Sequence, residues 1–194
     1  MAISDRLKAF LQESRVTYTA LKHPVVYTAQ EIAAAQHVPG RQLAKCVLVK
    51  TAQGPVLAVL PAIRLINLKK LKILLGAKTL GIGKEADIRE RFPDVEVGAM
   101  SPFGNLYQVP VVVDRELEGS EEIVFNAGSH TDTIKMRYRD FAALVKPKSG
   151  AFGQPIGGPA AKKKAGAKAT RGKRPRPKTT TRRGGTPSSR RKKT

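Results

Sequence analysis

The sequence predicts an α/β domain of the α+β type, in which helices flank a mixed, mainly antiparallel sheet, followed by a disordered basic C-terminal tail. Two observations predict the sheet: aliphatic, β-branched segments occur in pairs joined by turns, and strands do not alternate strictly with helices. A third observation, the distribution of charge, predicts the tail. The chain has 194 residues, with 36 Lys and Arg against 15 Asp and Glu, and a formal net charge of +21.

Charge divides the chain near residue 147. Residues 1–147 hold 20 basic residues and all 15 acidic residues, which leaves a net charge of +5. Residues 148–194 hold the other 16 basic residues and no acidic residue. The first part is long enough to bury a core, whereas the second has too few apolar side chains to offset the entropy lost on ordering. We therefore expect a domain over residues 1–147 and a disordered tail over residues 148–194.

The N-terminal segment is predicted to contain two helices and a short strand. Apolar residues at helical spacing follow Ser4, whose hydroxyl is suited to capping a first turn. A strand over 16–21 comes next. Thr28 and Glu31 have the spacing of a capping box, which predicts the start of a second helix that ends by Pro39.

The centre of the domain is predicted to form a hairpin and a helix. Segments 43–51 and 56–62 are aliphatic and flank a Gln-Gly-Pro turn, so we expect them to pair. Asn67 is suited to capping the next helix, and Gly76 stands where a helix end favours glycine. The remaining predicted elements are a helix at 84–92, strands at 107–114, 123–127 and 133–136, and a closing helix at 140–145.

Several classes of protein are excluded by what the sequence lacks. A single cysteine, Cys46, cannot form an internal disulfide and fits a reducing compartment, so we expect a cytoplasmic protein. The longest uncharged run, 97–113, is broken by glycines and prolines, and the N-terminal residues do not resemble a secretory signal, so no membrane is expected. We find no metal-binding spacing, nucleophile elbow or phosphate loop, and therefore expect no cofactor and no metal.

Lys45 is the first candidate functional residue. Strand alternation places it on the apolar face that carries Val47 and Val49. Partial burial disfavours the charged form of a lysine, whereas an anionic ligand such as a phosphate favours it. The alternative is that Lys45 lies near a strand end and extends its ammonium group to solvent.

Two glycine-containing loops are the next candidates. Gly98-Ala-Met-Ser-Pro-Phe-Gly104 precedes a predicted strand, and its glycines would let backbone amides approach an amino acid or a developing oxyanion. An ordinary connection shaped by turn residues remains the alternative. Asn126-Ala-Gly128-Ser-His130 follows another strand, and its histidine is equally consistent with an ordinary exposed or hydrogen-bonded side chain.

In order and spacing, five segments over roughly residues 15–146 resemble the YbaK-type aminoacyl-tRNA deacylases, which are related to the editing domain of bacterial prolyl-tRNA synthetases. These segments are Leu43-Ala-Lys45-Cys-Val-Leu-Val49, the helix after Asn67 with its Leu-Gly76-Ala end, the 98–104 loop, Pro110-Val-Val-Val-Asp114 and Asn126-Ala-Gly128-Ser-His130.

The resemblance implies hydrolysis of the ester that joins a wrong amino acid to the 3′-terminal adenosine of a tRNA. It implies that Lys45 is essential and engages the terminal nucleotide, while the loop holds the aminoacyl group through backbone contacts. The substrate-binding residues expected on this basis are Gly98, Ser101, Pro102, Phe103, Gly104, Gly128 and His130. Ala99, Met100 and Phe103 depart from the cysteine-specific members, so cysteine, alanine, serine and threonine all remain open as the amino acid removed. Mischarged tRNA, and an aminoacyl-tRNA synthetase, are the implied partners.

Two further features have competing interpretations. Cys46 alternates to the strand face opposite Lys45, which indicates a buried structural thiol rather than a nucleophile. Lys69 and Lys70 are equally consistent with contacts to tRNA phosphates and with a solvated helix face.

The tail has the composition of a nucleic-acid-binding arm, with no tyrosine or tryptophan for stacking. We expect phosphate-directed binding to RNA or other nucleic acid, and an extension without a specific partner is the alternative. The basic residues expected to bind are Lys162, Lys163, Lys164, Arg171, Lys173, Arg174, Arg176, Lys178, Arg182, Arg183, Arg190, Arg191, Lys192 and Lys193. The sequence thus leaves two hypotheses: a tRNA-editing hydrolase with an RNA-binding arm, and a non-catalytic nucleic-acid-binding or regulatory protein that uses the same domain for recognition.

Overall fold

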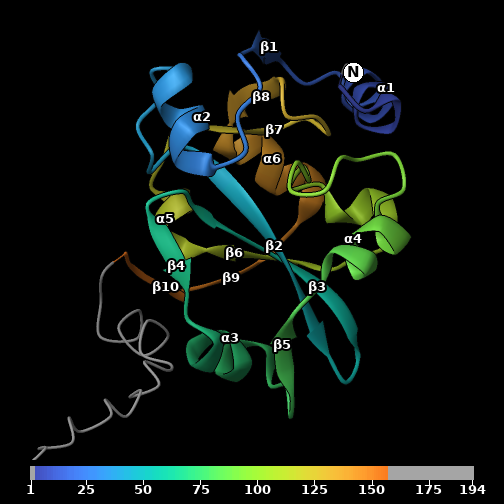
Figure 1. Ribbon diagram of the computed structural model, residues 1–194, viewed down its shortest axis with the longest axis vertical. Helices are drawn as coiled ribbons and strands as arrows, with labels where there is room; N and C mark the ends of the chain where they lie inside the picture. The colour runs from blue at the N-terminus through green and yellow to red at the C-terminus, as the bar shows by residue number, and fades with distance from the viewer. Residues whose placement is uncertain (1–2, 157–194) are drawn as a thin grey trace, which may run out of the picture.

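A computed structural model of the chain describes residues 3–156. Its helices surround two larger sheets and a small one (Figure 1). The helices are α1 (Asp5–Glu13), α2 (Ala29–Ala35), α3 (Leu68–Leu75), α4 (Glu85–Arg91), α5 (Arg115–Glu118), α6 (Tyr138–Val145) and the 3-10 helix η1 (Gly104–Tyr107). The strands are β1 (Tyr18–Lys22), β2 (Ala44–Thr51), β3 (Gly54–Pro61), β4 (Arg64–Ile66), β5 (Leu80–Ile82), β6 (Val111–Asp114), β7 (Glu122–Asn126), β8 (Asp132–Arg137), β9 (Lys148–Gly150) and β10 (Gly153–Pro155).

The sheets confirm the predicted α+β class. The five-stranded sheet has the order β5-β2-β3-β6-β9, with antiparallel pairs on the β2 side and parallel pairs from β3 to β6 and from β6 to β9. The three-stranded sheet, β1-β8-β7, is antiparallel throughout, and β10 pairs antiparallel with β4. A parallel bridge between Leu43 and Val124 connects the start of β2 to the three-stranded sheet.

The main core lies between these two larger sheets. It takes Leu48 from β2, Val59 from β3 and Phe125 from β7, together with apolar residues of α1 and α6. The other face of the five-stranded sheet is covered by α3, through Leu71. Each strand of the hairpin therefore contributes alternate side chains to two different cores.

Local sequence signals placed several elements correctly. Thr28 and Glu31 form the predicted capping box of α2, in which each side chain accepts a hydrogen bond from the other residue's backbone. The Asn67 side chain caps α3 as predicted. Ser4, in contrast, does not cap α1 through its side chain; its hydroxyl donates to the Asp94 carboxylate at 2.7 Å.

The strand predicted over 107–114 is wrong at its start. Tyr107 ends the 3-10 helix η1, and Gln108 follows in a left-handed conformation, so β6 begins only at Val111. The side chain of Tyr107 is buried in the main core and donates to Asp94 at 3.0 Å. A tertiary contact thus replaces the extended conformation that the aliphatic run favours.

The described fold continues beyond residue 147, where the sequence places the start of the tail, to residue 156. Strand β9 pairs with β6, and β10 pairs with β4. Two backbone N–H groups, those of Phe152 and Gly153, donate to the Asp114 carboxylate at 2.8 and 2.6 Å. The Phe152 ring is fully buried against the α3 side of the sheet. Residues 157–194, on which the rest of the predicted tail falls, lie outside the described residues.

We predict that Phe152→Ala destabilises the domain by about 3–5 kcal/mol, the usual cost of truncating a buried phenylalanine. Chemical denaturation would measure this change. The control is Ile156→Ala, because the Ile156 side chain is exposed. Equal midpoints for the two variants would show that residues 148–156 do not contribute to the fold.

Candidate active site

A cavity of about 170 Å³ opens where the start of β2, the end of β7 and α2 meet. Both predicted features, Lys45 and the loop that begins at Gly98, reach this cavity. It is lined by Tyr27, Ala29, Ile32, Leu43, Ala44, Lys45, Cys46, Gly98 and Asn126. The lining contains no carboxylate and no imidazole among the described residues, so Lys45 supplies its only formal charge.

Lys45 is half-buried on the apolar face of β2, as alternation predicted. Its Nζ donates to the Ala62 carbonyl oxygen at 3.3 Å, and within residues 3–156 it forms no ion pair. Burial lowers the pKa of this ammonium group below its usual value. An anion bound in the cavity would stabilise the charged form of Lys45, which burial disfavours.

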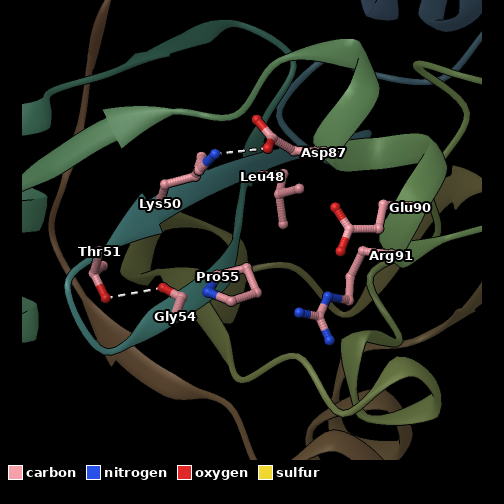
Figure 2. A pocket seen from close by; sticks show the side chains of 8 residues that line it. All are labelled: Leu48, Lys50, Thr51, Gly54, Pro55, Asp87, Glu90 and Arg91. Atoms are coloured by element: carbon pink, nitrogen blue, oxygen red, sulfur yellow. Dashed lines mark hydrogen bonds and ion pairs between the residues drawn. The ribbon is translucent and has the colours of Figure 1, made fainter.

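A second lysine on the same strand shows the contrasting arrangement. Lys50 lies at the far end of β2, beside a cavity of about 220 Å³, and its Nζ pairs with Asp87 at 2.6 Å. Figure 2 shows this pair linking β2 to α4 at the top of the cavity, with Glu90 and Arg91 of the same helix below Asp87. Because the Lys50 charge is already neutralised and its side chain is 57% exposed, this cavity lacks the unpaired buried cation of the first.

The backbone at Gly98 is held in an unusual conformation. Its φ is +93°, a region that side chains disfavour, and a Cβ at this position would lie 3.4 Å from Cε1 of His130. The Gly98 carbonyl accepts a hydrogen bond from Asn126 Nδ2 at 3.4 Å. In the described part of the chain the Gly98 N–H donates no hydrogen bond. An amide without a partner, in a cavity that also holds a half-buried ammonium group, can bind an anionic oxygen.

His130 and Gly128 hold this loop from behind the cavity rather than lining it. The imidazole Nε2 lies 3.0 Å from the Val97 carbonyl, which can only accept, so this nitrogen carries the proton. The His130 backbone N–H donates to the Glu96 carboxylate, and the Gly128 N–H donates to the Ala99 carbonyl at 3.1 Å. These contacts fix both sides of Gly98.

The His130 ring also packs against Tyr27, with ring centroids 4.8 Å apart. Tyr27 is 72% exposed at the rim of the cavity. We did not predict Tyr27 from the sequence, because nothing in the residues around it indicates a site.

Asn126 is a further site residue that the sequence reasoning did not assign. Its Oδ1 is buried and has no hydrogen-bond partner within the described residues, while its Nδ2 contacts Gly98. A buried acceptor without a partner is costly unless a water or a ligand satisfies it, and Asn126 lines the cavity, so it is a candidate binding residue. Its position at the end of β7, in the motif that contains Gly128, was the available signal.

The rest of the predicted loop lies in the core. Phe103 is fully buried, and its ring packs against those of Phe125 and Phe141, with centroids 5.7 and 5.6 Å away. Gly104 lies where a Cβ would meet the Val109 carbonyl at 2.6 Å, so its role is close packing. Ser101 and Pro102 are buried and do not line the cavity. The family resemblance implied that these four residues shape the pocket, whereas Gly98 is the residue of this loop that lines the described cavity.

Cys46 points toward the main core, on the face opposite Lys45, as predicted. Burial raises the pKa of its thiol, which therefore stays protonated at neutral pH. A protonated thiol is a poor nucleophile, so covalent catalysis by Cys46 is not supported.

Within residues 3–156, no cluster of three His, Cys, Asp or Glu side chains is arranged to hold a metal ion. In the same residues we find no helix long and apolar enough to cross a membrane. The fourteen basic residues predicted to bind nucleic acid, from Lys162 to Lys193, lie outside the described residues.

Comparison with known proteins identifies relatives of this chain. The prolyl-tRNA editing protein ProX of Acetoanaerobium sticklandii is 28% identical over 150 residues, which span 74% of this chain and 91% of that protein. The proline–tRNA ligase of Thermosipho africanus is 33% identical over 92 residues, covering 47% of this chain but only 16% of the ligase. A crystal structure described as a candidate trans-editing enzyme for prolyl-tRNA synthetase shares the fold, with a TM-score of 0.70 and 20% identity over 78% of this chain and 96% of that one.

The family model for the aminoacyl-tRNA editing domain matches residues 23–144, which include β2, the Gly98 loop and His130. This match spans well over half of the chain, and its boundaries enclose the cavity around Lys45. The chain therefore belongs to the aminoacyl-tRNA editing domain family.

Proposed function

We propose that this chain is an aminoacyl-tRNA deacylase, which hydrolyses the ester between a wrong amino acid and the terminal ribose of a tRNA. The observation that carries the proposal is the half-buried Lys45 ammonium group, which has no ion pair within residues 3–156 and lines the same cavity as Gly98. Such a pair suits an anionic or developing-anionic ligand, and the family match supplies the class of substrate.

The chemistry needs little from side chains. The oxygen of a water molecule attacks the ester carbonyl carbon, and the carbonyl electrons move to oxygen to form an oxyanion. The bond to the ribose oxygen then breaks, and the proton lost by water passes to that oxygen through solvent, which yields a free amino acid and a free ribose hydroxyl. One amide donor aimed at such an oxyanion contributes about 2.7–4 kcal/mol to transition-state stabilisation.

Each site residue has a role in this scheme. The Gly98 N–H stabilises the oxyanion, and the Lys45 ammonium group holds the terminal nucleotide. Asn126 Oδ1 accepts from the substrate's α-amino group, which satisfies its buried lone pairs. His130 and Gly128 position the Gly98 backbone and do not touch the substrate.

We propose tRNA specific for proline, carrying a small amino acid, as the substrate. The support is that the relatives described above are named as prolyl-tRNA editing proteins or proline–tRNA ligases. A synthetase gains only about 1–3 kcal/mol from one methylene, so smaller or isosteric amino acids need a separate editing site. The prolyl-tRNA synthetase would then be a functional partner, and the cytoplasm, where tRNA is charged, would be the location.

A panel of tRNAs charged with alanine, cysteine, serine or threonine, and with the cognate proline as control, tests the proposal. We expect release of at least one small amino acid from tRNA specific for proline, and no release of proline. If none of the esters turns over, the alternative of a non-catalytic nucleic-acid-binding protein is favoured instead.

We further propose that residues 157–194 add RNA affinity, because they contain 15 basic residues and no acidic residue. A chain that ends at Ile156 keeps β9 and β10, so we predict an unchanged melting temperature. We predict weaker tRNA binding with a shallower dependence on salt, measured by filter binding between 50 and 200 mM salt. An unchanged affinity and salt slope would exclude the tail as an anchor.

A further inference from the structure

Although the net charge of the domain is small, its basic and acidic residues are concentrated in different segments of the sequence. Residues 32–84 contain nine basic residues and no acidic residue. Residues 85–147 contain twelve acidic and seven basic residues. The positive segment forms most of α2 and then β2, β3, β4, α3 and β5. Two of its charges, Lys50 and Arg64, are paired with Asp87 and Glu116.

Helix α3 carries the densest part of this charge. Lys69, Lys70 and Lys72 are exposed, and Lys78 follows just after the helix. None of the four forms an ion pair within residues 3–156, whereas Lys50 is paired with a carboxylate. We call Lys69, Lys70, Lys72, Lys78 and Lys148 the α3 basic face.

Lys148 belongs to this face because β9 packs on α3. Its Nζ donates to the Leu74 carbonyl at 2.7 Å, near the C-terminal end of the helix. Gly150 packs directly against the Leu74 side chain. Strand pairing with β6 therefore adds a fifth ammonium group to the four of the α3 segment.

The α3 basic face lies on the same side of the sheet as the candidate active site. Lys45 alternates with Val47 and Val49, and these two valines pack in the cluster that contains Leu71 of α3. Residues 45 and 49 are separated by about 13 Å along a strand. Figure 1 shows α3 and β5 at the end of the molecule opposite α2, so the face extends away from the cavity along the sheet.

The chain leaves the described structure beside this face. Asn67, which caps α3, donates from its Nδ2 to Gln154 Oε1 at 2.9 Å. Gln154 lies two positions before the last described residue, Ile156. The described part of the chain therefore ends close to the residue that caps α3.

We infer that the α3 basic face binds backbone phosphates in the helical stem of the tRNA whose aminoacyl end occupies the Lys45 cavity. The inference rests on the proposed function for its choice of partner. The contact is sequence-independent, because unpaired lysines on an exposed helix recognise phosphate charge and not base edges. It supplies binding energy at a distance from the ester, so it changes KM and leaves the chemical step untouched.

The test replaces three charges on α3 in the full chain: Lys69→Gln, Lys70→Gln and Lys72→Gln together. A matched control removes three charges elsewhere, with Lys8→Gln, Arg15→Gln and Lys22→Gln. These control side chains are exposed and make no ion pair within residues 3–156, and they lie on or near α1 and β1, far from α3 (Figure 1). Both variants carry the same net charge, so non-specific attraction falls equally.

Binding of uncharged tRNA is measured first, as a function of salt. If all three lysines contact phosphates, the α3 variant loses about 2–3 units from the slope of log affinity against log salt, at about 0.7–0.9 per phosphate. The control variant keeps a slope close to that of the unmodified chain. Equal slopes for the two variants would overturn the inference, and this outcome does not depend on any deacylase activity.

Deacylation is measured next, on mischarged tRNA and on a short aminoacylated fragment of its 3′ end that lacks the stem. The α3 variant should show a raised KM for the tRNA, an unchanged rate at saturation and an unchanged rate on the fragment. A matching loss on the fragment would place the effect in the cavity and contradict a stem contact. A failure of the proposed function appears separately, as an absence of turnover by the unmodified chain.

Discussion

Replacing Lys45 with alanine is expected to lower kcat/KM for the mischarged tRNA by about 10²-fold, with little effect on the melting temperature. The Lys45 ammonium group is the only formal charge lining the cavity among the described residues, and it has no carboxylate partner there. A hydrogen bond to a charged group contributes about 1.5–3 kcal/mol, which corresponds to about 10- to 150-fold in rate. Single-turnover deacylation with purified mischarged tRNA measures the loss.

The same strand offers a matched control in Lys50→Ala. Lys50 is paired with Asp87 and lies at the other end of β2, so its removal should change kcat/KM by less than a few-fold. Lys45→Arg keeps the charge but not the shape of the compact ammonium group, and should recover only part of the activity. Equal losses for Lys45→Ala and Lys50→Ala would contradict a specific role for the cavity.

Gly98→Ala is expected to reduce deacylation by about 10- to 100-fold, the second-largest effect that we predict. The Gly98 φ of +93° is costly for alanine, by about 1–3 kcal/mol, while the added Cβ would make only an ordinary contact with the His130 ring. The backbone must rotate to relieve this strain, which moves the N–H assigned to the oxyanion. A displacement of about 1 Å at a reacting centre can cost about 10²-fold in rate.

The control for backbone strain is Gly54→Ala. Gly54 has a φ of +124° at the start of β3, directly after the turn, and a Cβ there would meet nothing within 4 Å. Both substitutions should lower the melting temperature, but only Gly98→Ala should lower activity. If both variants lose activity in proportion to stability, the Gly98 amide has no special role.

Structural features that depend on residues close together in the sequence were predicted well. The capping box at Thr28 and Glu31 and the cap at Asn67 were correct because both involve hydrogen bonds within one turn of chain. The pairing of β2 and β3 as a hairpin was also correct, but the turn is Ala52-Gln53, and Gly54 and Pro55 of the predicted turn already belong to β3. The position of Lys45 on an apolar face follows from the same alternation.

Structural features that depend on contacts between residues distant in the sequence were not predicted, or were predicted at another place. The burial of Phe152 requires the Asp114 carboxylate, which accepts from the backbone 38 and 39 residues later. Strands β4, β5, β9 and β10 have three residues each, too few to show a period. Phe103 was assigned to the pocket from its motif, but aromatic contacts with Phe125 and Phe141 hold it in the core.

By itself, the sequence determined the class of fold, the family resemblance and the identity of the one lysine on an apolar strand face. These depend on periodicity, on turn chemistry and on the order of motifs, all of which are local along the chain. Only the tertiary structure decided that Gly98 and Asn126 complete the cavity around Lys45, that the domain extends to residue 156, and that five lysines gather around α3. Each of these depends on which distant segments pack together, because burial and charge pairing are set by neighbours in space.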